Sequence, residues 1–288
     1  MTVGRALSLS KTLLAVCAGV GAVGGWLGLR AAPANILWSA VWTLPILSAP
    51  SLIAGWLSIH VARDYPGGSA MRKSWLLIGS SACAVGVSQA INFGSYIARL
   101  EGRGGEWVGF RQHANLVSIV LLFVALFFMW QSFARLGFGL SLRAGDQLTM
   151  LAIGAAAVMF LAFYQDMPDS RSKAFLVRSL QFANPLLLAA LAVLGVLLRR
   201  ISLEIGEGQL ARSLRYLLLM LMARLLVIAL GIVPVAHNNT LFSMARSAMM
   251  WSVPALFLLA VVERWKLIHA ATEIANHPED AIPADFVR

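Results

Sequence analysis

Apolar residues occur along the chain in eight long runs that are separated by short polar segments. The runs cover residues 12–30, 36–62, 75–98, 115–134, 147–165, 180–198, 214–236 and 245–263. Each run reaches or approaches the roughly 20 residues that a helix needs to cross a bilayer. Membrane strands would instead alternate polar and apolar residues over about ten positions, and these runs do not alternate. The pattern therefore predicts an all-α fold, a polytopic transmembrane helical bundle of about eight spans.

Composition and charge agree with a membrane bundle. Of the 288 residues, 59% are hydrophobic and 12% are charged, whereas soluble domains carry roughly 25% charged residues. The net charge is +10, but the basic residues lie mostly at the ends of the apolar runs. This distribution favours anionic lipid head groups as partners and argues against a nucleic-acid surface.

The lysine and arginine positions predict how the chain is threaded. With the N-terminus inside, 14 of these residues fall in inside segments and 8 in outside segments. The positive-inside rule then makes both termini cytoplasmic, and we expect the inner (plasma) membrane as the location. We divide the chain into a bundle, 1–264, and an amphipathic cytoplasmic tail, 265–288. Apolar residues of the tail share one helical face: Leu267, Ile268, Ala271 and Ile274.

The third run combines a polar face with a face of small residues. At helical spacing its polar side chains fall on one side: Ser81, Ser88, Gln89, Asn92, Ser95 and Tyr96. A second face is small at every fourth position: Ala82, Gly86, Ala90 and Gly94. Small residues at this spacing let membrane helices approach closely, so we expect this helix at the centre of the bundle.

Glycine and proline predict local features of the first two runs. Two glycine pairs in the first run indicate another packing face: Gly21/Gly25 and Gly24/Gly28. The second run contains Pro45 and Pro50. Proline removes a backbone donor from a helix, so this run is predicted to be kinked or broken.

Arg224 lies deep in the seventh run. It follows Arg215 by nine residues, which is about 13 Å along a helix. A charge at the bilayer centre costs at least ~2.5 kcal/mol on insertion scales, so the guanidinium needs acceptors. No acidic residue lies deep in any run, so a partner subunit, an anionic ligand or backbone carbonyls near Pro185 could supply the acceptor, as could the amides of two other runs: Gln89, Asn92, Gln181 and Asn184. We predict that Arg224 and these four residues bind an anionic or polar ligand.

A structural role for Arg224 is the alternative to ligand binding. Its side chain could join helices through neutral hydrogen bonds, or extend toward the inner surface. Unchanged ligand binding in a folded Arg224→Met variant would favour that alternative.

The histidines and cysteines offer weaker signals. His60 and His269 lie toward the predicted inner face, and His113 and His237 toward the outer face. Two pairs on two sides would suit a di-haem cytochrome, but haem ligands of such proteins lie within helices. We therefore interpret these histidines as interfacial and leave the cofactor open. The two cysteines lie inside apolar runs without any zinc-binding spacing, so no metal site is expected.

The sequence favours a protein without catalysis. It contains no HExxH, GxSxG or paired intramembrane carboxylates, and no catalytic residue is assigned. The first hypothesis is a non-catalytic subunit, scaffold or signal-relaying accessory protein of a membrane complex, with other membrane subunits as partners. The second is a transporter or binding protein for a small anionic or lipid-like ligand. The third is a haem-binding membrane anchor of a redox complex.

Overall fold

The computed structural model describes residues 3–30, 32–100, 108–138, 142–165, 175–206, 209–232 and 239–276. Every regular element in these ranges is helical, and the ranges contain no strand. The elements are α1 (Val3–Arg30), α2 (Ala32–Trp42), η1 (Thr43–Ser48), α3 (Ala49–Arg63), α4 (Ala70–Leu100), α5 (Val108–Ala134), α6 (Ala144–Gln165), α7 (Phe175–Ile205), α8 (Gln209–Ile232) and α10 (Thr240–Asn276). The predicted all-α class is confirmed.

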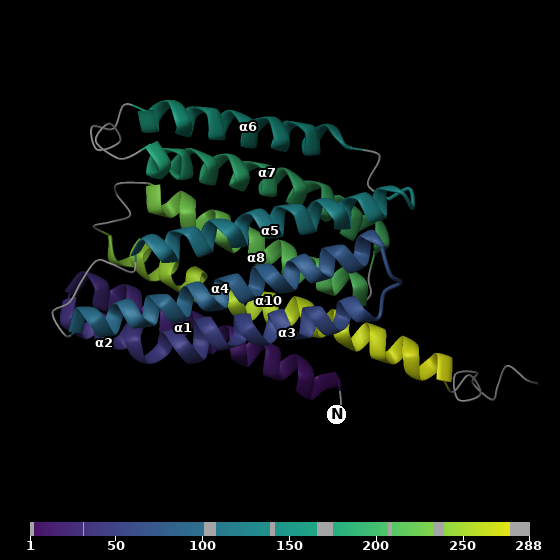
Figure 1. The fold of residues 1–288 in the computed structure, drawn as a ribbon, viewed down its shortest axis with the longest axis horizontal. Helices are drawn as coiled ribbons and strands as arrows, with labels where there is room; N and C mark the ends of the chain where they lie inside the picture. The colour runs from purple at the N-terminus through teal and green to yellow at the C-terminus, as the bar shows by residue number, and fades with distance from the viewer. Residues whose placement is uncertain are drawn as a thin grey trace, which may run out of the picture.

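The helices lie side by side along the long axis of the molecule (Figure 1). Successive helices run in opposite directions, if α2, η1 and α3 are counted together as one rod. Helices α6 and α7 form one edge, and α1, α2 and α3 form the other. This arrangement brings α10, near the end of the chain, into contact with α1, α3 and α8.

Among the described residues, five helices are long and apolar enough to cross a membrane, which indicates a membrane protein. They are Ile36–Arg63, Ala70–Ala98, Ala114–Arg135, Leu186–Ile205 and Thr240–Ala270. Two shorter apolar helices, Thr12–Leu27 and Ala144–Val158, accompany them in the described part of the chain. The count of eight spans and the orientation stay predictions.

The second apolar run forms one rod made of three consecutive helical segments. Helices α2 and α3 are joined by η1, a π-helical segment that contains Pro45, and Pro50 lies in the first turn of α3. Proline cannot donate to the helical ladder, and a π turn accommodates the lost bond by widening the helix locally. The run is therefore not broken, as one form of the prediction had it, and its helical pattern changes to a π-helical segment at Pro45.

Close helix contacts follow the glycines, though only part of the predicted small face is used. A Cβ atom on Gly79 of α4 would lie 2.9 Å from the carbonyl oxygen of Gly55 in α3. Ser48 donates across the same contact to the carbonyl of Gly86, at 2.9 Å. Ala90, however, is exposed, and a Cβ on Gly94 would meet nothing within 4 Å. The face that packs begins one turn earlier than predicted and ends at Gly86.

The glycine face of α1 packs against α10. A Cβ on Gly21 would lie 2.6 Å from the carbonyl oxygen of Ser247, and one on Gly25 would lie 2.5 Å from that of Ser243. This half of the prediction is confirmed. Gly24 instead faces Trp38 of α2, and the side of Gly28 lies outside the described residues.

Buried apolar side chains from α3, α4, α5, α7, α8 and α10 form the main core. Its fully buried members include Ile78, Leu122, Met129, Leu191, Leu198, Met220 and Val261. Helix α10 continues without interruption past residue 264 to Asn276, so the predicted tail begins as part of this helix. Residues 277–288 lie outside the described part of the chain.

Candidate functional site

Arg224 is paired with an amide of a neighbouring helix. Its Nη2 donates to Oδ1 of Asn115 on α5, at 2.8 Å. Arg224 is half-buried and Asn115 is exposed. The predicted kind of partner, a neutral amide from another run, is therefore present, but Asn115 was not among the four candidates. The apolar run begins at residue 115, whereas α5 begins at Val108 and places Asn115 two turns inside the helix.

The four predicted partners of Arg224 are placed elsewhere or lie outside the description. Asn92 is buried and donates from Nδ2 to the hydroxyl of Tyr96, at 3.2 Å. Oε1 of Gln89 is buried without a hydrogen-bond partner in the described part of the chain. Gln181 and Asn184 belong to α7, but their side chains lie outside the described residues. Ligand binding by these residues and Arg224 stays a prediction.

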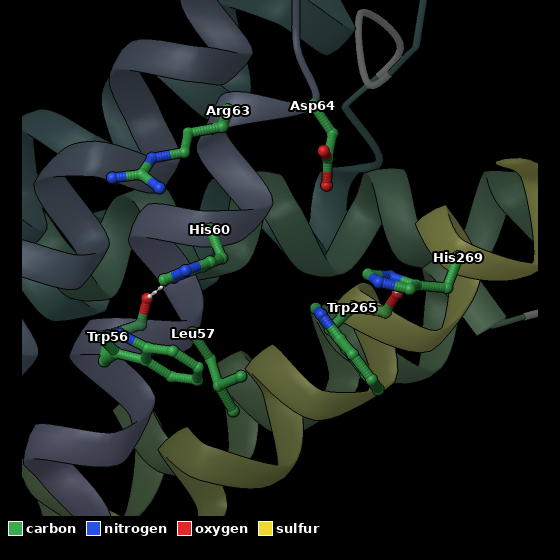
Figure 2. A pocket seen from close by; sticks show the side chains of 7 residues that line it. All are labelled: Trp56, Leu57, His60, Arg63, Asp64, Trp265 and His269. Carbon is green, nitrogen blue, oxygen red and sulfur yellow. Dashed lines mark hydrogen bonds between the residues drawn. The ribbon is translucent and has the colours of Figure 1, made fainter.

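A pocket of about 330 Å³ lies between α3 and α10, at the end of the bundle where α3 finishes (Figure 2). Its volume falls at the lower end of the roughly 300–1,000 Å³ range of small-molecule sites. Helix α3 and the residue that caps it supply five of the lining side chains, and α10 supplies two: Trp56, Leu57, His60, Arg63, Asp64, Trp265 and His269. We name this cavity the α3/α10 pocket.

The two walls of the α3/α10 pocket carry the same side-chain pair. Trp56 and His60 on α3, like Trp265 and His269 on α10, are four residues apart, which places each pair on one helical face. The ring centroids lie 4.1 Å apart in both pairs. Figure 2 shows the two histidines on opposite sides of the open space between the helices. The pocket is thus lined by two equivalent indole–imidazole pairs.

Backbone hydrogen bonds fix the protonation pattern of both imidazoles. Nδ1 of His60 lies 3.0 Å from the carbonyl oxygen of Trp56, and Nδ1 of His269 lies 3.1 Å from that of Trp265. A carbonyl oxygen only accepts, so each Nδ1 carries the hydrogen and donates it. In the neutral ring Nε2 is then an unprotonated acceptor, on the ring edge farther from its own helix.

An arginine and a tyrosine connect the two walls. Arg264, directly before Trp265, donates from Nη2 to the hydroxyl of Tyr65, directly after Asp64. The guanidinium carbon also lies 5.4 Å from the centroid of the Tyr65 ring, within cation–π range. Arg264 is only 8% exposed, and its Nε and Nη1 have no partner in the described part of the chain. This brace ties the end of α3 to α10 beside the pocket.

Sequence reasoning missed the α3/α10 pocket, although one signal was present. His60 and His269 were both placed near the inner face, but each was interpreted as a separate interfacial residue. The repeated Trp-x-x-x-His spacing at the ends of two apolar runs could have linked them. His113 and His237, the predicted outer pair, have side chains outside the described residues. Among the described residues, no group of three or more His, Cys, Asp or Glu side chains is arranged to hold a metal ion.

The fold and the pocket together describe a helical membrane protein with a ligand-sized cavity at one end of its bundle. No protein-family model, curated protein or solved structure matches the chain.

Proposed function

We propose that the protein is a non-catalytic, multi-pass membrane protein that binds a small amphipathic ligand in the α3/α10 pocket. The observation that carries the proposal is the pocket itself, with its two indole–imidazole pairs on facing helices. A polar rim supports it, because Arg63 and Asp64 are exposed and line the same cavity. A few polar groups converging on an aromatic surface are typical of ligand sites.

The proposal includes the predicted topology. Eight helical rods cross the plasma membrane, and both termini lie in the cytoplasm. The count of 14 inside against 8 outside basic residues supports this orientation. In this frame the α3/α10 pocket lies at the cytoplasmic interface, the depth that tryptophan side chains prefer.

Native mass spectrometry of the protein purified in a mild detergent tests ligand binding. The wild-type protein is expected to retain a small bound molecule, and the double variant Trp56→Ala/Trp265→Ala is expected to lose it. Trp56 is 58% exposed, so its truncation removes little core packing. Trp26→Ala is the matched control, because Trp26 is 39% exposed and lies on α1, outside the pocket. Equal retention by the three proteins would reject the proposal.

A second candidate function, a subunit or accessory protein of a membrane complex, is favoured by helix α6. Among the described elements α6 packs mainly against α7. It exposes Leu148, Leu151 and Val158, each by 66% or more. Exposed apolar surface of this extent suits lipid or a partner helix. Cross-linking in native membranes from cysteines placed at these three positions would identify a partner, and adducts with lipid alone would remove this candidate.

A further inference from the structure

The α3/α10 pocket has one imidazole on each of two facing walls. Since each Nδ1 is committed to a backbone carbonyl, Nε2 of His60 and Nε2 of His269 are the imidazole atoms left for a ligand. Metal-binding and substrate-binding histidines are commonly oriented by such a backbone bond. A ligand that fits between these rings therefore needs hydrogen-bond donors.

Asp64 adds a third acceptor and a negative charge. It caps α3 and is exposed. In Figure 2 the carboxylate projects toward the space between the two histidines. An ionised carboxylate only accepts hydrogen bonds. The pocket thus combines three acceptors, one of them anionic, with two indole side chains that attract cations.

We infer that the α3/α10 pocket recognises a primary ammonium group, as part of the phosphoethanolamine headgroup of a membrane lipid. A primary ammonium has three N–H donors and one positive charge, and is therefore the chemical complement of imidazole acceptors and a carboxylate. A trimethylated ammonium offers no N–H donor, and a phosphoglycerol headgroup offers no positive charge. The inference rests on the proposed function and specifies its ligand.

The remaining charge in the α3/α10 pocket suits the phosphate of the same headgroup. Arg63 lines the cavity one residue before Asp64, and its guanidinium forms strong bonds with phosphate oxygens. The pocket lies at the end of two helices long and apolar enough to cross a membrane, Ile36–Arg63 and Thr240–Ala270, where lipid headgroups are found.

Isothermal titration calorimetry on the full-length protein in detergent tests this assignment. The probes are dihexanoyl phosphatidylethanolamine, dihexanoyl phosphatidylcholine, dihexanoyl phosphatidylglycerol and soluble O-phosphoethanolamine. The ethanolamine lipid is expected to bind about tenfold or more tightly than the choline and glycerol lipids, because only its headgroup combines N–H donors with a positive charge. Weaker binding of O-phosphoethanolamine would show that the acyl chains contribute, whereas equal binding would make the soluble molecule the ligand and reject the lipid source.

Variants show where the lipid binds. They also distinguish a failure of the ligand assignment from a failure of the proposed function. Asp64→Asn keeps the size of the side chain and is expected to weaken the ethanolamine lipid about tenfold and the choline lipid less, because the choline headgroup loses a charge contact but no hydrogen bond. Lys266→Gln is the control, because Lys266 neighbours Trp265 but pairs with Glu263 and does not line the pocket.

Three outcomes decide the assignment. Selectivity for the ethanolamine lipid that is lost in Asp64→Asn supports it. Equal binding of the three lipids that is abolished by Trp56→Ala/Trp265→Ala rejects ammonium recognition but leaves the proposed function intact. Binding that is insensitive to every pocket variant, or no binding of any probe, overturns the assignment, and insensitivity overturns the proposed function with it.

Discussion

At the scale of single residues, the charged side chain of Arg264 is unusual because it is buried away from water. Arg264 is almost completely buried, and the hydroxyl of Tyr65 accepts from it in a bond that joins α10 to the end of α3. A buried charge that loses its partner is strongly destabilising. The brace therefore matters both for stability and for the spacing of the pocket walls.

Tyr65→Phe is expected to lower the free energy of unfolding by about 1–3 kcal/mol, because it removes the acceptor of a buried charged donor. Denaturant titration in mixed micelles measures the change. The same variant is expected to weaken ligand binding in the α3/α10 pocket, since the wall spacing is less constrained. Tyr216→Phe is the control, because Tyr216 packs against the same core from α8. Equal stability of the two variants would show that the brace contributes nothing.

The pair Arg224–Asn115 is expected to act as a structural link between α8 and α5. In a double-mutant cycle, Arg224→Met and Asn115→Leu should show a coupling energy of about 0.6–1.7 kcal/mol, the range of polar contacts between membrane helices. Strictly additive effects would contradict the link. Loss of ligand binding in a folded Arg224→Met variant would instead support the ligand role predicted from the sequence.

For Arg224, the sequence predicts a neutral amide as the partner but does not identify Asn115. The need for a neutral acceptor follows from the cost of a charge in hydrocarbon, which composition alone reveals. The choice of Asn115 depends on which helices are neighbours and on where α5 begins. Neither is encoded in the apolar pattern of a single run.

At the scale of elements, backbone approach is set by glycine. Helices α3 and α4 touch through Gly55 and Gly79, and α1 and α10 touch through Gly21 and Gly25. The sequence predicted the Gly21/Gly25 face of α1 correctly, whereas Gly24 of the second predicted pair faces Trp38 of α2. It placed the α4 face too far along the helix, because Ala90 and Gly94 satisfy the same spacing without facing a neighbour.

Gly79→Ala is expected to destabilise the protein by about 1–3 kcal/mol, since the new Cβ would overpack the contact with Gly55. The shift of α3 should also reduce ligand retention, because α3 carries Trp56 and His60. Gly94→Ala on the same helix is the matched control. It meets nothing within 4 Å and is expected to be neutral, or to stabilise the helix by up to about 1 kcal/mol. Similar losses in both variants would contradict the packing argument.

At the scale of the whole molecule, the sequence predicted the helical class from the lengths of its apolar runs. It could not predict the α3/α10 pocket, because His60 and His269 are separated by more than two hundred residues. Only the packing of α10 against α3 brings the two indole–imidazole pairs together. Their proximity is a tertiary property.

Cysteine labelling in intact cells tests the proposed threading. In a background lacking Cys17 and Cys83, Gly67→Cys, between α3 and α4, is expected to be protected from a membrane-impermeant maleimide. Gly105→Cys, between α4 and α5, is expected to react with it. The reverse pattern would invert the topology and place the α3/α10 pocket at the outer surface.

A cryo-EM map of the protein in nanodiscs that contain phosphatidylethanolamine tests the central claim most directly. Our account predicts density for a headgroup between His60 and His269, beside Asp64, continuous with acyl chains along the outside of the bundle. A map that shows the α3/α10 pocket filled only by water, at a resolution that reveals lipids elsewhere on the bundle, would contradict it.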